Sequence, residues 1–427
     1  MNKKLYPFCL VSGLALSLTV TAQTTQQTVE QRLKALEQRV QRAEQEATEA
    51  KARNEDLEVA VSQQANQQSA SAFNPGIGVI LNGKAIYREN NGEDFTIPGI
   101  WLPYESGYGD DGLQLGESEL NLSSNVDDKF YGAITVALGD GADVEEAYLQ
   151  TLALPAGFNI KFGRFFSSIG YLTRHHTHTD DFAQRPFAYQ AFLGGQYGDD
   201  GIQFNWLAPT DLYWESGVEV FRGDGYPAEG AGHRGVGSWT AYSHIGGDIG
   251  FSNSWRAGLS YLNATVENRE NDTGDTFSGD SDLWIIDGIW KWAPDGNSTQ
   301  RNAKLQAEYI QRNEKGDFTS DSTGLQAIDS DQSGWYVQGV YQFRPRWRVG
   351  LRYEQMDLGT VPSALQASSL DPLGHSPKNT SLMIDWTNSE FSRIRLQLTA
   401  DQSNQDNNTL LTLQYIAAFG AHGAHSF

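Results

Sequence analysis

Apolar residues are spaced in two different ways along the 427-residue chain. Between Val29 and Val61 they recur every three or four residues, which is the period of an α-helix. From Pro75 onward they alternate with polar residues in short segments, which is the period of a β-strand with one polar face. The pattern therefore predicts a helical N-terminal segment followed by an all-β region over residues 75–427.

The helical segment carries a heptad seam. Its core positions are Val29, Leu33, Leu36, Val40, Ala43, Ala47, Ala50, Asn54, Leu57 and Val61. Most residues between them are charged, Gln or Ala, so the pattern predicts an associating coiled coil over 23–62, with Asn54 fixing register or oligomeric state. A single solvated helix is the alternative, because three core alanines make the seam thin. The Gln- and Ser-rich stretch 63–74 is predicted to be a flexible linker.

Sixteen alternating segments follow Pro75. They lie near 76–88, 112–125, 128–139, 143–155, 158–167, 199–209, 211–223, 236–249, 254–266, 281–293, 301–314, 333–344, 346–357, 378–388, 392–403 and 408–427. Each has about the ten residues that a tilted transmembrane strand needs. In 346–357, for example, the apolar side is Trp347, Val349, Leu351 and Tyr353, and the polar side is Arg346, Arg348, Arg352 and Glu354.

The connections between these segments alternate in length. Short turns such as Asp127-Asp128 and Pro345 alternate with long polar insertions such as 89–111, 168–198 and 315–332. Short turns at one end and long loops at the other are typical of outer-membrane barrels, as are aromatic residues at strand ends. We therefore predict an all-β transmembrane antiparallel barrel of about 16 strands, preceded by an α-helical coiled coil.

The first residues indicate the cellular location of the barrel. Lys3 and Lys4 precede an apolar run that ends in small residues at Ala22, which predicts an export signal over 1–22. Without those two lysines the chain has 29 basic and 53 acidic residues, a balance that argues against a nucleic-acid partner. The only cysteine, Cys9, lies inside the signal. We expect the barrel in a Gram-negative outer membrane and the coiled coil in the periplasm.

Charged residues on the polar faces are predicted to line a water-filled lumen. The acidic ones are Glu117, Glu119, Glu146, Glu215 and Glu219, and the basic ones are Lys84, Arg88, Arg346, Arg348, Arg352, Arg393 and Arg395. On opposing walls these two groups would create a transverse field across the pore. The alternative is that they pair across neighbouring strands and only stiffen the wall.

The insertion 168–198 follows the fifth segment and is our candidate for a loop that narrows the pore. It contains His175, His176, His178 and Asp180. On an extended chain alternate members of this group share one side, an arrangement that suits Zn²⁺ or Cu²⁺. A hydrated loop without a metal is the alternative, and we expect no other cofactor.

Two sets of motifs resemble known families. Val144–Leu149 and Ile160–Phe166 resemble the acidic-Ala-Tyr and Lys-x-Gly-x-Phe hairpin of the phosphate-selective porin O and P superfamily. Leu115–Leu120, Gln196–Gly201, Trp206–Thr210 and Gly420–His425 resemble a group of proteobacterial outer-membrane proteins labelled zinc-regulated or TonB-dependent receptors. The resemblance covers most of 73–427, and it implies the barrel fold more than it implies the solute.

The prediction for function is a porin-like channel for passive diffusion of small hydrophilic solutes or ions. The alternatives are a receptor or uptake channel for a metal ion such as zinc, and a barrel that tethers the cell wall. No enzyme is expected, because the sequence has no G-x-S-x-G nucleophile motif. Expected partners are outer-membrane lipid, lipopolysaccharide, two further copies in a homotrimer, and peptidoglycan.

Overall fold

The computed structural model describes residues 75–90, 95–103, 106–139, 141–230, 235–271, 274–366 and 368–420. The predicted signal, coiled coil and linker, with the residues Val29 to Val61 of the seam, lie outside these ranges. The described chain begins at Pro75 with the barrel, and residues 75–427 form a compact unit of their own.

Strands make up most of this unit. The strands are β1 (Gly76–Arg88), β2 (Gly112–Leu115), β3 (Ser118–Asn125), β4 (Phe130–Leu138), β5 (Ala142–Thr151), β6 (Phe158–Phe166), β7 (Gly198–Leu207), β8 (Tyr213–Phe221), β9 (Ser238–Ile249), β10 (Asn253–Glu270), β11 (Thr276–Trp292), β12 (Asn302–Ser320), β13 (Gly324–Arg344), β14 (Trp347–Asp357), β15 (Lys378–Ser389), β16 (Ser392–Gln402) and β17 (Asn408–Gly420). The helices are the α-helix α2 (Phe187–Leu193) and the 3-10 turns η1 (Pro155–Gly157), η2 (Thr177–Thr179), η3 (Pro294–Gly296) and η4 (Ser363–Leu365).

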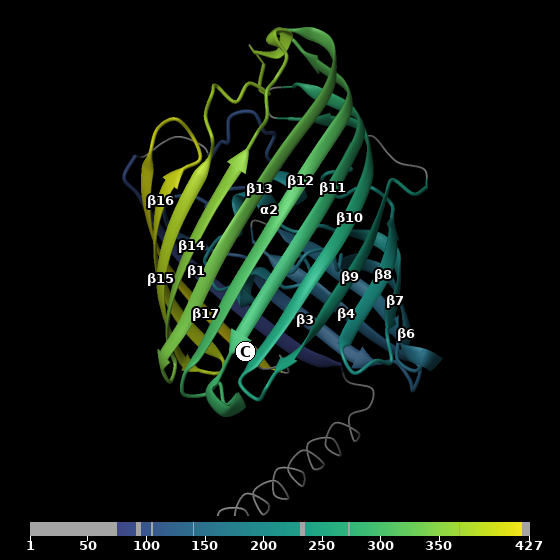
Figure 1. The fold of residues 1–427 in the computed structure, drawn as a ribbon, viewed down its shortest axis with the longest axis vertical. Coiled ribbons are helices and arrows are strands. Elements are labelled where there is room, and N and C mark those ends of the chain that lie inside the picture. The colour runs from purple at the N-terminus through teal and green to yellow at the C-terminus, as the bar shows by residue number, and fades with distance from the viewer. Residues whose placement is uncertain are drawn as a thin grey trace, which may run out of the picture. The chain divides into compact units, whose positions relative to one another are not determined.

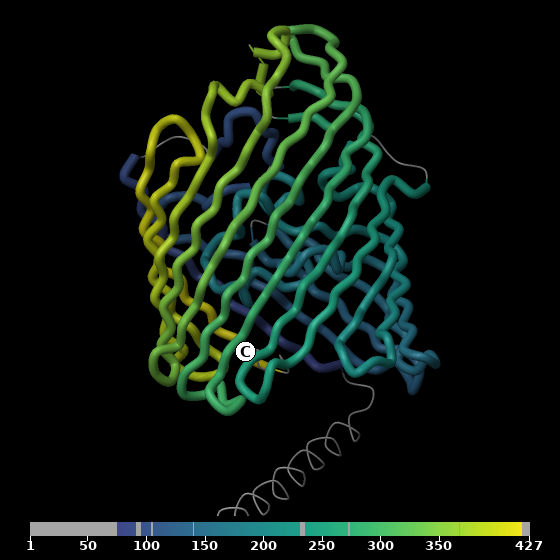
Figure 2. Tube along the Cα trace, viewed as in Figure 1, coloured from purple at the N-terminus to yellow at the C-terminus, as the bar shows by residue number. Residues whose placement is uncertain are grey.

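The strands form one sheet that closes on itself (Figures 1 and 2). Each strand pairs antiparallel with its neighbours, and β1 pairs with β17 from Gly78 to Arg88. Both β2 and β3 pair with β1, and only Gly116 and Glu117 separate them, so they are one interrupted strand of the wall. The 17 described strands therefore make a wall of sixteen. This confirms the predicted antiparallel barrel.

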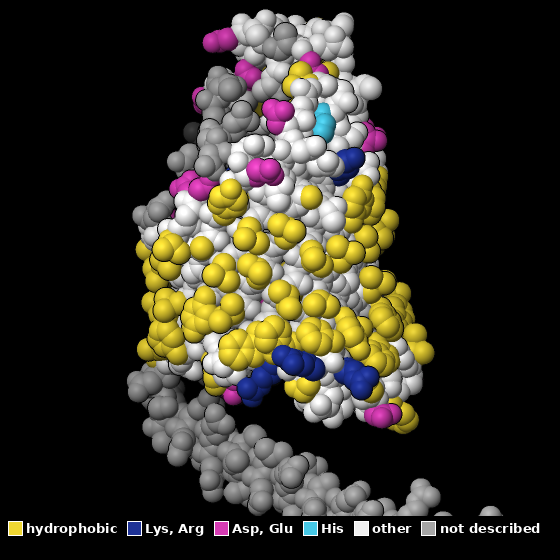
Figure 3. Space-filling model, turned by 90° about the vertical axis from the view of Figure 1, so that its left-hand side faces the viewer, with side chains coloured by type: hydrophobic (Ala, Val, Ile, Leu, Met, Phe, Trp, Pro, Cys, Tyr) yellow, Lys and Arg dark blue, Asp and Glu magenta, His cyan; other side chains and the backbone are white. Residues whose placement is uncertain are grey.

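The wall is apolar outside and polar inside. On β15, Leu382 is 55% exposed, whereas Ser381 and Asp385 are 1% exposed. On β16, the exposed Leu396 alternates with the buried Arg395. Figure 3 shows the result as a band of hydrophobic side chains between more polar zones. An apolar belt around a polar interior is the pattern of a barrel in a lipid bilayer. Within the described ranges, no helix has the length and hydropathy to span a bilayer.

The polar insertion predicted at 315–332 is not a loop. The strands β12 and β13 continue through it and leave only residues 321–323 as the turn. Lys315 lies opposite Asp329 in this extension, with Nζ 3.6 Å from Oδ2. Both side chains are exposed, because a backbone ladder of hydrogen bonds needs no apolar face once it has left the membrane. Sequence alternation alone ended the first of these strands too early and began the second too late.

The connection from β6 to β7, residues 167–197, folds into the barrel, and we call it the inner loop. Its helix α2 lies behind the front wall in Figure 1 and contacts β12, β13 and β14. All seven residues of α2 are buried. The inner loop therefore positions the candidate site.

Candidate functional site

Carboxylates of the wall hold the backbone of the inner loop. Glu219 on β8 accepts hydrogen bonds from Ser167 Oγ and from the Ser168 amide, the latter at 3.0 Å. On the other side, Glu308 on β12 accepts from the Tyr171 amide at 2.9 Å and from the Tyr189 hydroxyl at 2.7 Å. A buried carboxylate needs hydrogen-bond donors of this kind, because burying it without a partner is costly. These pairs fix the loop at two walls.

Apolar packing fixes the loop from a third direction. Tyr189 and Phe192 of α2 are fully buried in one hydrophobic cluster with Ile285 and Ile310 of the wall. These inward apolar residues break the expected alternation, and the prediction missed them. The run Leu283–Ile286 is apolar on both faces, which was the available signal.

The histidines of the inner loop approach an acidic part of the wall. We call Glu119 on β3, Glu145 and Glu146 on β5, and His176 and His178 the histidine cluster. Glu119 Oε1 lies 2.6 Å from His178 Nδ1, and Glu119 Oε2 lies 3.2 Å from His176 Nδ1. The other ring nitrogen of His176 is 3.1 Å from Glu146 Oε2. Burial would lower the pKa of His176, but its carboxylate neighbours outweigh burial and raise that pKa to about 12.

The predicted metal set was partly wrong. His175 turns away from the cluster, and its Nδ1 lies 2.6 Å from the Tyr171 carbonyl oxygen. Burial, with Arg174 nearby, lowers the pKa of His175 to about 3. Asp180 also points elsewhere and accepts from Arg185 Nε at 2.9 Å. The cause is local backbone geometry, since the 3-10 turn η2 replaces the extended chain on which the prediction depended.

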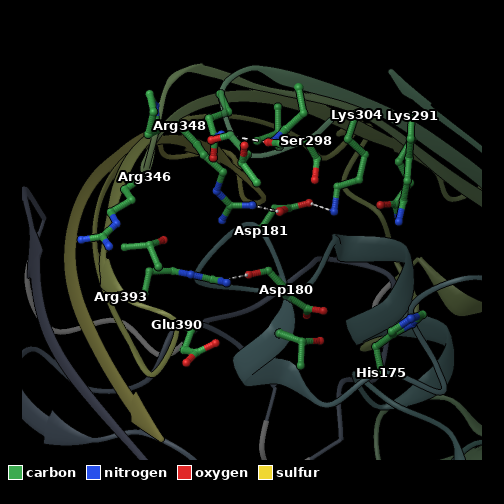
Figure 4. A pocket seen from close by; sticks show the side chains of 18 of the residues that line it. His175, Asp180, Asp181, Lys291, Ser298, Lys304, Arg346, Arg348, Glu390 and Arg393 are labelled. Carbon is green, nitrogen blue, oxygen red and sulfur yellow. Dashed lines mark hydrogen bonds and ion pairs between the residues drawn. The ribbon is translucent and has the colours of Figure 1, made fainter. Parts of the chain in front are cut away.

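On the opposite wall the inner loop borders a basic cavity of about 730 Å³ (Figure 4). The cations that line it are Lys291, Lys304, Arg346, Arg348 and Arg393. The cavity also touches the turns at 298–300 and at Glu390, so it lies at the short-turn end of the barrel.

Asp181 of the inner loop anchors that wall. Arg348 Nη1 lies 2.9 Å from Asp181 Oδ1, and Lys304 Nζ contacts the other oxygen. Burial would raise the pKa of Asp181, but Lys304 and Arg348 outweigh it and hold that pKa well below its usual range.

Most of the predicted pore-lining residues contact the inner loop. They do so from two sides: Glu117, Glu119, Glu146, Glu215 and Glu219 from β2 to β8, and Arg348, Arg352, Arg393 and Arg395 from β14 and β16. The other three also have partners outside the inner loop. Lys84 interacts with Glu117, Arg88 pairs with Asp111 at 3.5 Å, and Arg346 donates to the Asn388 carbonyl at 2.8 Å. The nine charges that contact the inner loop thus reach it from different sides, the acidic ones from the β2–β8 side and the basic ones from β14 and β16.

A comparison with known sequences gives two findings. A family model described as the maltoporin periplasmic N-terminal extension matches residues 28–56, inside the segment predicted as a coiled coil. A protein of Aquifex aeolicus strain VF5, described as uncharacterized, is 30% identical over 390 residues. That alignment covers 84% of this chain and 81% of the relative.

Solved structures with the same fold are outer-membrane proteins. Pseudomonas putida OprB is 13% identical and superposes with a TM-score of 0.50 over 81% of this chain and 94% of its own. The outer membrane channel DcaP of Acinetobacter baumannii is 15% identical, with a TM-score of 0.50 over 81% of this chain and 97% of its own. At these identities the likeness concerns the fold, which is a porin-like β-barrel.

Proposed function

We propose that this protein is an outer-membrane channel for passive diffusion of small hydrophilic solutes, with a preference for anions. The proposal starts from its porin-like barrel. The chain belongs to the family of the Aquifex aeolicus protein. The basic cavity carries this proposal. It lies at the short-turn end, beside the inner loop, where a solute passing through the barrel would meet it.

The charge of the cavity sets the expected preference. Five cations and three carboxylates line it, the carboxylates being Asp180, Asp181 and Glu390. With His175 neutral, this leaves a surplus of two positive charges. A concave surface of one sign concentrates ions of the other sign. The acidic residues of β3, β5 and β8 lie across the inner loop, so we infer a transverse field that orients dipolar solutes.

The remaining assignments are part of the same proposal. Residues 1–22 are an export signal, 23–62 a periplasmic coiled coil that assembles three copies, 63–74 a linker and 75–427 the barrel. The matched N-terminal extension supports the periplasmic location of the helical segment. We propose no catalytic role, because the wall carboxylates Glu219 and Glu308 serve to hold the inner loop. Contacts with lipopolysaccharide and peptidoglycan stay predictions.

Swelling of liposomes tests the channel. Proteoliposomes that contain the purified protein should swell in isotonic solutions of a small neutral sugar and of a small organic anion. The organic cation of equal size should enter more slowly, and protein-free liposomes are the control. If no solute enters, the barrel is closed and the tethering alternative replaces the channel. If the cation enters faster, the channel remains but the anion preference is wrong.

A further inference from the structure

The histidine cluster is a candidate metal site on the wall opposite the basic cavity. We propose that Glu119, His176 and His178 bind a divalent transition-metal ion, with Zn²⁺ as the first candidate, and that the ion fastens the inner loop to β3. This site goes beyond the proposed channel and does not depend on it.

The donor atoms are already close to one another. One ligand atom from each of Glu119, His176 and His178 lies within 4.8 Å of the other two. Donors around a tetrahedral Zn²⁺ are roughly 3.4 Å apart, given bonds of about 2.1 Å. The two imidazole nitrogens lie 2.6 and 3.2 Å from the Glu119 oxygens, so small side-chain rotations would open a position for the ion. Glu119 and His178 are buried, with side chains 2% and 1% exposed.

Both wall strands at the cluster depart from regular pairing. On β5, Thr135 of β4 pairs with Glu146 and Val136 pairs with Val144, so Glu145 forms a β-bulge. In a regular strand, successive side chains point to opposite faces, but a bulge re-aims one of them. As a result both Glu145 and Glu146 reach His176, with closest atoms at 3.6 and 3.1 Å.

The second irregularity is the break between β2 and β3. It lies at Gly116 and Glu117, where the Gly116 amide donates to the Asn82 carbonyl at 2.7 Å. Beyond the break, Ser118 Oγ accepts from the Asn82 amide at 3.1 Å. Bulges are over-represented next to active sites, where they re-aim a side chain. The bulge and the break, on the wall strands that flank β4, therefore shape this one cluster.

The charge of the cluster favours a cation. Glu117, Glu119 and Glu145 each offer an oxygen within 4.8 Å of the others, in addition to the contacts with the histidines. Lys84 and Arg185 are described cations that interact with Glu117. Lys161 interacts with Glu146, and Arg185 is itself bound to an aspartate. With both imidazoles neutral, as metal ligands are, the four carboxylates Glu117, Glu119, Glu145 and Glu146 therefore share three positive side chains. Buried negative charge is costly unless a cation compensates it.

The donor set selects the kind of ion. Two imidazole nitrogens and one carboxylate suit Zn²⁺, Cu²⁺ and their first-row neighbours, whereas Ca²⁺ and Mg²⁺ prefer oxygen donors alone. Three protein ligands leave a fourth position, and Glu145 Oε2 is placed to fill it. That atom is buried, lies 3.6 Å from His176 Nδ1 and makes no hydrogen bond among the described residues.

Calorimetric titration of the full-length protein in detergent with ZnCl₂ tests the site. His422 and His425, which lie outside the described residues, are first replaced by Gln so that their own metal binding does not contribute. In this background we expect saturable binding of one Zn²⁺ per chain. Co²⁺ should bind in its place and give the visible absorption of a nitrogen- and oxygen-ligated ion. No saturable heat with Zn²⁺ would overturn the proposal.

The variants separate the site from the rest of the loop. His178→Gln and Glu119→Gln should each weaken Zn²⁺ binding roughly tenfold or more, because each removes a direct ligand. His175→Gln is the matched control, since it changes an imidazole of the same loop that faces Tyr171, and it should bind like the parent. If His178→Gln does not fold, His176→Gln at the more exposed ligand takes its place. Equal weakening by His175→Gln, or none by the ligand variants, would contradict the site.

Discussion

The anion preference depends on the cations of the basic cavity. We consider the triple variant with Lys291, Arg346 and Arg393 all changed to Gln. These side chains line the cavity, and changing them leaves the ion pairs of Lys304 and Arg348 with Asp181 in place. The cavity would then change from a surplus of two positive charges to a surplus of one negative charge. The inner loop loses the hydrogen bond from Arg393 to the Asp180 carbonyl but keeps both ion pairs of Asp181.

The size of the effect follows from the cavity volume. A sphere of 730 Å³ has a radius of about 6 Å, so a permeating ion at its centre lies about 6 Å from each lining charge. In water that distance gives about 0.7 kcal/mol per charge, and screening in 0.1 M salt reduces this to about 0.4 kcal/mol. Three charges together give about 1.2 kcal/mol, close to the ~1.4 kcal/mol that corresponds to a tenfold change.

Reversal potentials in a KCl gradient measure this change. Counting the effect on the anion alone, we expect the chloride-to-potassium permeability ratio to fall about sevenfold in the triple variant. The control is Arg344→Gln, which removes a cation at the same turn but from a side chain that stacks on Trp347 instead of lining the cavity. An unchanged reversal potential in the triple variant, or an equal shift in the control, would refute the reasoning.

Three other perturbations have defined outcomes. Asp181→Asn should loosen the inner loop, because Lys304 loses this ion pair and Arg348 keeps only the one with Asp385. The loss should be about 1.5–3 kcal/mol, and single-channel records should flicker more than those of Asp295→Asn at an exposed turn. Leu382→Arg on the lipid face should lower the free energy of unfolding in lipid vesicles by about 2–4 kcal/mol, whereas Leu325→Arg beside the extended turn should have little effect. Leu33→Asp should dissociate the predicted trimer in chemical cross-linking, and a persistent trimer would show that the seam does not assemble the protein.

The wall of the barrel was predictable because lipid and water impose a strict period of two on each strand. The interruption at Gly116 and the bulge at Glu145 were not, since each depends on what the neighbouring strand and the inner loop place opposite it. The extension of β12 and β13 was missed for a different reason. Residues 315–332 are mostly polar, with only scattered apolar residues such as Phe318 and Ile328, and such a composition does not distinguish a loop from a strand in water.

The site was predictable only in part. The histidines of the inner loop and the acidic wall residues were each identified as candidates from the sequence. Their meeting was not, because His176 and Glu119 are far apart in the chain and belong to a loop and to the wall. Local spacing instead suggested His175 and Asp180 as ligands, and the η2 turn directs both elsewhere. Contacts between a loop and a barrel wall leave no periodic signal in the sequence.

The electrical conductance of single molecules in a planar lipid bilayer tests the central claim most directly. The wild-type protein should give discrete current steps, set by the space that the inner loop leaves open. A variant in which Pro186–Gly194 is replaced by a short Gly-Ser linker should give larger steps, because α2 no longer fills that part of the lumen. If neither protein conducts, the barrel is not a channel.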